Sequence, residues 1–150
     1  MSRVVLLDSG PLGLLSDPKP SPRVLACGQW SRALLAAGSR LLIPEIVDYE
    51  VRRELLRAKK MKGLAALDAL AMRLGYLRIE TPIMQLAASL WAQARQRGRP
   101  TAGNASLDCD VILAAQALSL GDPNVIVATT NVAHISRYVP ADLWENIPTT

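Results

Sequence analysis

The stretch "RVVLLD" (residues 3–8) places four consecutive apolar residues directly before an aspartate. A continuous apolar run of this length is typical of a short strand buried on both faces, as in a parallel sheet covered by helices. The strand ends on Asp8, and "SGPLGLL" (residues 9–15) follows as a turn into a short helix. A carboxylate at the end of a buried strand needs a physical reason, because an uncompensated charge is costly to bury.

Similar apolar runs alternate with helical patterns along the chain. We expect further strands at 40–44, 76–82 and 124–131, and helices at 23–38, 45–59, 63–75, 83–98 and 107–121. Strands and helices that alternate in this way predict an α/β fold, a three-layer α/β/α sandwich with a mainly parallel sheet. The turn-rich segment 99–106 is expected to be a loop. The tail is expected to be irregular, with one short edge strand at 137–139 or near 143–147.

Length and composition limit the class of protein. At 150 residues, half of them apolar and none of them Phe, the chain suits a single domain spanning residues 1–150. Two distant cysteines, Cys27 and Cys109, and one histidine argue against a zinc site or a disulfide framework, so we expect two buried thiols. The sequence has neither an apolar run of about 20 residues nor a signal peptide, which favours a soluble, cytoplasmic protein without a membrane segment.

Basic residues gather in "RRELLRAKKMK" (residues 52–62), and the net charge of the chain is +4. Such a run is either a solvated helix face or a patch that contacts phosphates. The candidates for RNA contacts are Arg52, Arg53, Arg57, Lys59 and Lys60.

Acidic residues follow several of the predicted strands. Ligands of open parallel sheets bind beyond the carboxyl ends of the strands, where loops converge. A cluster of carboxylates without Cys or His ligands suits Mg²⁺ or Mn²⁺, which prefer oxygen donors and can activate a bound water against a phosphodiester. Taken singly, each acid is also explained as a helix cap or a solvated charge. The residues concerned are Asp8, Glu45, Asp48, Glu50, Asp108, Asp110 and, as a polar neighbour, Asn131.

Helical spacing narrows this set. Asp108 and Asp110 project about 200° apart on a helix, so they cannot both face one ion. Asp110 shares its face with small alanines that let a helix lie close to a sheet, which favours Asp110 for the site and Asp108 or Ser106 as the N-cap. Glu50 shares a face with Arg53 and other charged residues, whereas Glu45 and Asp48 suit the first turn of the same helix.

The order of these motifs resembles the PIN domain, including the VapC-like ribonucleases of toxin–antitoxin pairs. The resemblance rests on Asp8 after "VVLL", Glu50 inside "EIVDYEVRREL", Asp110 in "DVILAAQA" and the closing "VATTNVAHISRY". It implies an α/β/α domain that binds Mg²⁺ or Mn²⁺ and hydrolyses RNA. It further implies that Asp8, Glu50 and Asp110 are metal ligands, that Ser9 with Thr130 or Asn131 supports the site, and that a small antitoxin and a homodimer are the protein partners.

The last motif departs from the family pattern. Family members often carry another acid at position 131 or 134, where this chain has Asn131 and His134. His134 is a replacement metal ligand, a proton donor to the leaving oxygen, or a neutral side chain hydrogen-bonded near the sheet. The main hypothesis is therefore a metal-dependent endoribonuclease, and the alternative is a PIN-fold module that binds RNA or protein without cleavage.

Overall fold

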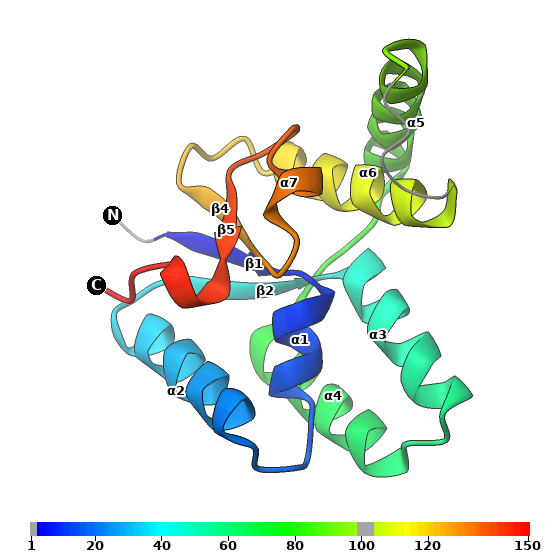
Figure 1. Ribbon diagram of the computed structural model, residues 1–150. Helices are drawn as coiled ribbons and strands as arrows, with labels where there is room; N and C mark the ends of the chain where they lie inside the picture. Colours follow the sequence, from blue (N-terminus) through cyan, green and yellow to red (C-terminus); the bar gives the residue numbers. More distant parts are fainter. Residues whose placement is uncertain (1–2, 99–103) are drawn as a thin grey trace.

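A five-stranded parallel sheet forms the centre of the protein (Figure 1). The computed structural model describes residues 3–98 and 104–150, the first four of the second range by their backbone alone. The strand order is β3-β2-β1-β4-β5, and every neighbouring pair is parallel, which confirms the predicted fold class. The strands are β1 (Val4–Leu7), β2 (Arg40–Pro44), β3 (Tyr76–Leu77), β4 (Val125–Thr129) and β5 (Ala141–Leu143).

Helices cover both faces of the sheet. In Figure 1, α1 (Ser9–Leu15), α2 (Pro22–Ala36) and α4 (Met61–Leu74) lie below it, and α5 (Thr81–Gln96) and α6 (Asn104–Ser119) lie above. Helix α3 (Glu45–Arg57) continues directly from the carboxyl end of β2 and contacts α1, α4 and α6. The short helix α7 (Val132–Ile135) follows β4. Both helical layers therefore meet at the carboxyl ends of the strands.

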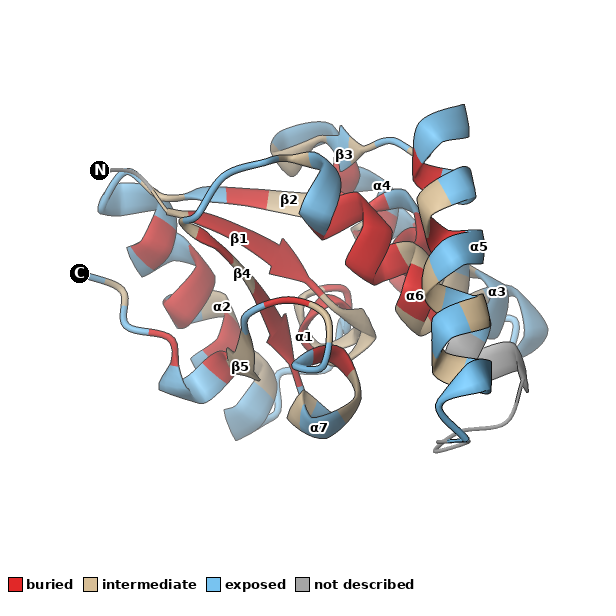
Figure 2. Cartoon of the chain, turned by 90° about the horizontal axis from the view of Figure 1, so that it is seen from above, coloured by how far each residue is buried: buried red, intermediate tan, exposed pale blue. Residues whose placement is uncertain are grey.

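The core lies on both sides of β1, all of whose residues are buried (Figure 2). This burial explains why the apolar run in β1 is continuous rather than alternating. The C-terminal tail is part of the same core, because Trp144 packs against Trp30 at 5.7 Å between ring centroids. The Trp30 indole N–H also donates to the carbonyl of Ile147 at 3.1 Å. Within the described ranges, no helix combines the length and apolar character needed to cross a bilayer.

Three sequence expectations about the elements are wrong in detail. Strand β3 has only two residues, because side chains bond the backbone where further strand pairing would be needed. The Glu45 carboxylate accepts from the Ile79 amide, and the Gln116 side chain donates to the Leu77 carbonyl. Helix α6 already begins at Asn104, so residues 104–106 of the predicted loop are helical. Ser106 and Asp108 therefore lie inside the helix, and neither is its N-cap. Residues 99–103 of that loop lie outside the described residues. In the tail, 132–135 are helical, and the edge strand lies at 141–143, beside the alternative expected near 143–147 and not at 137–139.

Candidate functional site

Asp8 lies immediately beyond β1, where the sheet register places it beside β4. Leu7 is the register partner of Ala128, and the Asp8 amide donates to the Ala128 carbonyl at 2.9 Å. The next residue of β4, Thr129, therefore lies next to Asp8, and its hydroxyl donates to Asp8 Oδ2 at 2.7 Å. The Ser9 amide donates to Oδ1 at 2.7 Å, which makes Asp8 the N-cap of α1. Burial raises the pKa of Asp8, and these two hydrogen bonds oppose the rise.

Glu50 lies in the middle of α3 and faces the same region. Its pKa is raised to about 7, first by burial and then by the negative charges of Asp8 and Asp110. The guanidinium of Arg53 and a hydrogen bond with the thiol of Cys109 act in the opposite direction. Because only nearby like charges raise a carboxyl pKa in this way, the three acids form one electrostatic cluster. We call Asp8, Glu50 and Asp110 the carboxylate centre.

Asp110 completes the carboxylate centre from α6. Burial and the charge of Asp8 raise its pKa to about 6, while His134 and Arg137 act to lower it. Asp108 is exposed and makes none of these interactions. The structure thus brings Asp110, and not Asp108, to the other two acids, as the helical spacing indicated.

The segment after β4 approaches Asp110. His134 Nδ1 lies 3.6 Å from Asp110 Oδ2 and 3.1 Å from the side-chain nitrogen of Asn131. The Asn131 backbone amide donates to the Thr129 hydroxyl at 2.9 Å. The Thr130 side chain faces Gly10 so closely that a Cβ at that position would overlap it.

A family model described as the PIN domain matches residues 27–137, which is most of the chain. The chain belongs to the PIN domain family. A comparison with curated proteins found no match.

Solved structures share the fold of this PIN domain at low sequence identity. The structure of VapBC2 from Rickettsia felis bound to a promoter DNA fragment matches with a TM-score of 0.71 and 19% identity, covering 94% of this chain and 98% of that chain. The structure of VapBC-1 from nontypeable Haemophilus influenzae gives a TM-score of 0.67 and 20% identity, covering 95% and 99%. The structure of FitAcB from Neisseria gonorrhoeae matches with a TM-score of 0.62 and 19% identity, covering 95% of this chain and 99% of that chain.

The chemistry of the carboxylate centre suits a hard divalent cation. All of its donors are carboxylate oxygens, and their mutual repulsion would be relieved by a positive charge between them. Within the described residues, however, no three acidic, histidine or cysteine side chains stand close enough to enclose an ion by themselves. Water molecules would complete the coordination shell, as is usual for Mg²⁺.

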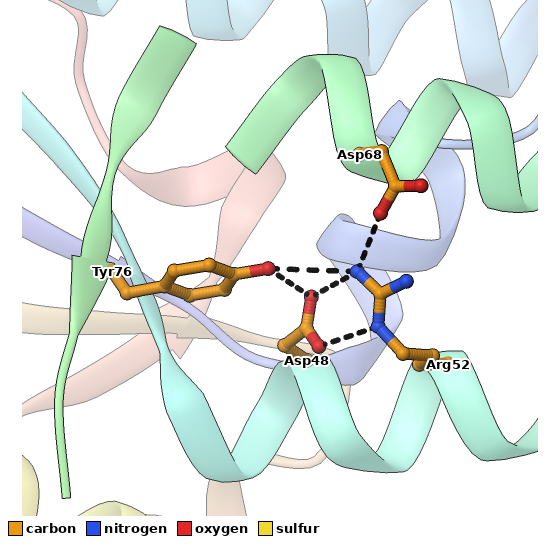
Figure 3. A network of polar contacts seen from close by, with 4 residues as sticks. All are labelled: Asp48, Arg52, Asp68 and Tyr76. Carbon is orange, nitrogen blue, oxygen red and sulfur yellow. Dashed lines mark hydrogen bonds and ion pairs between the residues drawn. The ribbon is translucent and has the colours of Figure 1, made fainter. Parts of the chain in front are cut away.

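Arg52 takes part in a network of polar contacts with three other side chains. Figure 3 shows its guanidinium turned toward Asp48, Tyr76 and Asp68. It contacts Asp48 Oδ2 at 2.9 Å and Asp68 Oδ1 at 2.8 Å, and the Tyr76 hydroxyl donates to Asp48 Oδ1 at 2.9 Å. These bonds hold α3 against α4 and β3 and raise the pKa of Arg52. Arg52 is therefore paired with two protein carboxylates, and its contact with RNA stays a prediction.

The other basic candidates differ among themselves. Arg57 is paired with Glu54 through bonds as short as 2.8 Å, so its charge is already compensated. The guanidinium carbon of Arg53 lies 5.0 Å from the centroid of the Tyr49 ring, and the charge of Arg53 lowers the pKa of Glu50. Lys59 and Lys60 are exposed at the end of α3.

Sequence reasoning missed three residues at the centre. Thr129, rather than its neighbour Thr130, holds Asp8, and only the register of β1 against β4 distinguishes the two. Cys109 is buried as expected, but its thiol also contacts Glu50. The place of Cys109 in the sequence, one residue before Asp110, gave no reason to expect this contact. The charge of Arg137 lowers the pKa of Asp110. Arg137 lies beyond α7, a helix that the sequence pattern did not predict.

Proposed function

We propose that the protein is a metal-dependent endoribonuclease that hydrolyses RNA phosphodiester bonds. The observation that carries the proposal is the carboxylate centre itself, in which three acids from three separate elements meet at the carboxyl edge of a PIN-family sheet. After burial, the charge of Asp8 raises the pKa of both Glu50 and Asp110, and the charge of Asp110 also raises that of Glu50. Buried like charges of this kind are unfavourable for stability alone and are typical of functional sites.

Asp8, Glu50 and Asp110 are the residues proposed to hold Mg²⁺ or Mn²⁺. Thr129 and Ser9 fix the carboxylate of Asp8 by donating to one oxygen each, which leaves the remaining lone pairs of both oxygens available. When bound, such an ion would lower the pKa of water and offset negative charge on a phosphodiester. His134 and Asn131 lie beside Asp110, at the position where many family members place another acid.

The proposal extends to a role as the toxin of a toxin–antitoxin pair. The support is the fold, which is shared with VapBC structures over nearly the whole length of both chains. A small antitoxin and a second copy of this chain are the proposed protein partners.

The decisive test is RNA cleavage by purified protein with Mn²⁺ or Mg²⁺. Asp110→Asn removes a charge from the centre and is expected to lower the cleavage rate by about 100-fold or more. Asp108→Asn makes the same chemical change two residues away on an exposed position of α6, so it should cleave like the parent protein. Equal cleavage by parent, Asp8→Asn and Asp110→Asn would indicate a contaminating nuclease and refute the proposal.

A non-catalytic binding module is the second candidate function. It is favoured by Asn131, which is neutral where many family members are acidic, and by the open arrangement of the three acids. Isothermal titration with Mn²⁺ separates the two functions. RNA binding without any Mn²⁺ binding at millimolar concentration would establish the binding module and exclude the nuclease.

A further inference from the structure

His134 lies beside the carboxylate centre, on the segment that follows β4. The Thr129 hydroxyl, which supports Asp8, also accepts the Asn131 backbone amide at 2.9 Å and so fixes the start of α7. Asn131 and His134 are three residues apart, so they lie on one face of this helical turn, and their side chains contact each other at 3.1 Å. The fold therefore places His134 at the edge of the sheet where the three acids meet.

The imidazole of His134 is close enough to Asp110 to share a metal ion with it. Its Nδ1 lies 3.6 Å from Asp110 Oδ2, and the two side chains are 27% and 23% exposed, so both are sheltered and both are reachable from solvent. Two ligands in neighbouring positions of an octahedral shell with bonds of about 2.1 Å lie about 3 Å apart. The observed separation is close to this spacing, so the pair fits two positions of one shell that water completes.

The donor that this segment adds to the centre is a nitrogen atom and not a further carboxylate. His134 is the only histidine of the chain, and its neighbour Asn131 is a neutral amide. Neither side chain attracts a cation by negative charge, as another acid would. Mg²⁺ takes oxygen ligands and gives up its water reluctantly, whereas imidazole suits first-row transition-metal ions. A nitrogen donor therefore favours Mn²⁺ over Mg²⁺ at the same three carboxylates.

We propose that His134 is a nitrogen ligand of the metal ion held by the carboxylate centre, and that it makes the centre selective for Mn²⁺ over Mg²⁺. The inference rests on the proposed function and deepens it, because it names one of the two ions and the residue that selects it. Asn131 contacts the ring and orients it, as the second partner of a metal-bound histidine usually does. The competing assignment of His134 is an imidazolium that pairs with the Asp110 carboxylate and does not touch the ion.

The first test uses the parent protein itself, freed of any purification tag and loaded with one equivalent of Mn²⁺ in a buffer without nitrogen ligands. Pulsed electron paramagnetic resonance detects the coupling between Mn²⁺ and the nitrogen of a bound imidazole. Because the chain has one histidine, such a coupling is assigned to His134 without any substitution. Protein grown with ¹⁵N-labelled histidine should show the ¹⁵N pattern in place of the ¹⁴N pattern. An imidazolium that only pairs with Asp110 gives no such coupling.

The second test compares the dissociation constants of Mn²⁺ and Mg²⁺, with Mg²⁺ measured by competition against Mn²⁺. His134→Gln should weaken Mn²⁺ binding by about 10-fold or more and change Mg²⁺ binding much less. His134→Asp exchanges the nitrogen for a charged oxygen donor, so it should tighten Mg²⁺ binding and reduce the preference for Mn²⁺. The matched control, Ala133→Gln, places the same amide on the neighbouring exposed residue of α7 and should bind both ions like the parent protein. Urea denaturation with a chelator present checks that each variant folds.

Bound Mn²⁺ without a nitrogen coupling would overturn the inference and leave His134 as an ion-pair partner of Asp110. The same preference for Mn²⁺ in the parent protein and in His134→Gln would overturn the selectivity. If the parent protein cleaves RNA but shows no coupling, only this inference fails. If it shows the coupling but never cleaves RNA, the metal ligand stands and the nuclease proposal fails. No Mn²⁺ binding at millimolar concentration would refute both.

Discussion

Asp8 can end a buried strand because two hydrogen-bond donors at the carboxyl end of β1 compensate for part of the cost of burying its charge. The Thr129 hydroxyl and the Ser9 amide each donate to one carboxylate oxygen at 2.7 Å. Hydrogen bonds to a carboxylate are among the stronger ones in proteins, yet burial still raises the pKa of Asp8. The remaining imbalance is what a bound cation would relieve, and it is the reason that a site fits here better than a simple cap.

Thr129→Val should test how strongly this support matters. The substitution keeps the shape of a fully buried side chain, but it removes the donor to Asp8 and the acceptor of the Asn131 amide. We expect a loss of about 1 to 2 kcal/mol in the free energy of unfolding, measured by urea denaturation, together with weaker Mn²⁺ binding. Thr129→Ser keeps the hydroxyl and should restore most of the Mn²⁺ affinity. Normal Mn²⁺ binding by the valine variant would show that Thr129 is structural only.

For single residues, the sequence predicts those whose place follows from a local strand or helix pattern. It misses those whose place depends on the register between strands. Asp8 follows from the apolar run before it, and Asp110 follows from the helical spacing that separates it from Asp108. The choice between Thr129 and Thr130 depends on how β4 aligns with β1, which no local pattern determines.

Helix α3 divides its charged residues between two faces. Glu50, Arg53, Glu54 and Arg57 share one face, as their spacing predicted, and this face lines an open groove between α1, α3 and α4. Asp48 and Arg52 lie on the other side and bind Tyr76 and Asp68. Because the network fixes the rotation of α3 against β3 and α4, it also determines where Glu50 points.

Arg52→Met should therefore destabilise the protein more than the loss of an ordinary surface ion pair. It leaves Asp48, which is only 8% exposed, with Tyr76 as its remaining side-chain donor among the contacts described. We expect a loss of about 2 kcal/mol in the free energy of unfolding. Asp68→Asn is the comparison: its side chain is 62% exposed, so the loss should stay below about 1 kcal/mol. Similar losses for both variants in urea denaturation would contradict this ranking.

Element boundaries were predictable only where local chemistry sets them. Helix α2 ends at Ala36, before Gly38 with its positive φ of 89°, as the glycine indicated. Strand β3 stops early because the distant side chains of Glu45 and Gln116 bond its continuation, and β5 forms by pairing with β4. Both are tertiary effects that an alternation of apolar residues does not reveal.

The carboxylate centre exists only in the folded molecule, because its three acids come from the end of β1, from α3 and from α6. Unfolding separates these charges and returns each carboxyl pKa to its ordinary value near 4. The folded protein therefore retains protons that the unfolded chain has released, most clearly at Glu50, with a pKa of about 7, and at Asp110, with a pKa of about 6. By linkage, this contribution to stability is fully present below the ordinary pKa and is lost as the pH rises through the raised values.

Urea denaturation in the presence of a chelator should show this loss across the molecule. Between about pH 4 and about pH 8, the free energy of unfolding of the parent protein should fall relative to that of Asp110→Asn, because the variant lacks one of the repelling charges. Asp108→Asn, which removes an exposed charge from the same helix, should follow the parent protein. At pH 8, Mn²⁺ at about 100 times its dissociation constant should add about 2.7 kcal/mol to the parent protein and much less to Asp110→Asn. Parallel pH curves for parent and Asp110→Asn, with the same Mn²⁺ effect in both, would mean that Asp110 neither shares the charge cluster nor holds the ion.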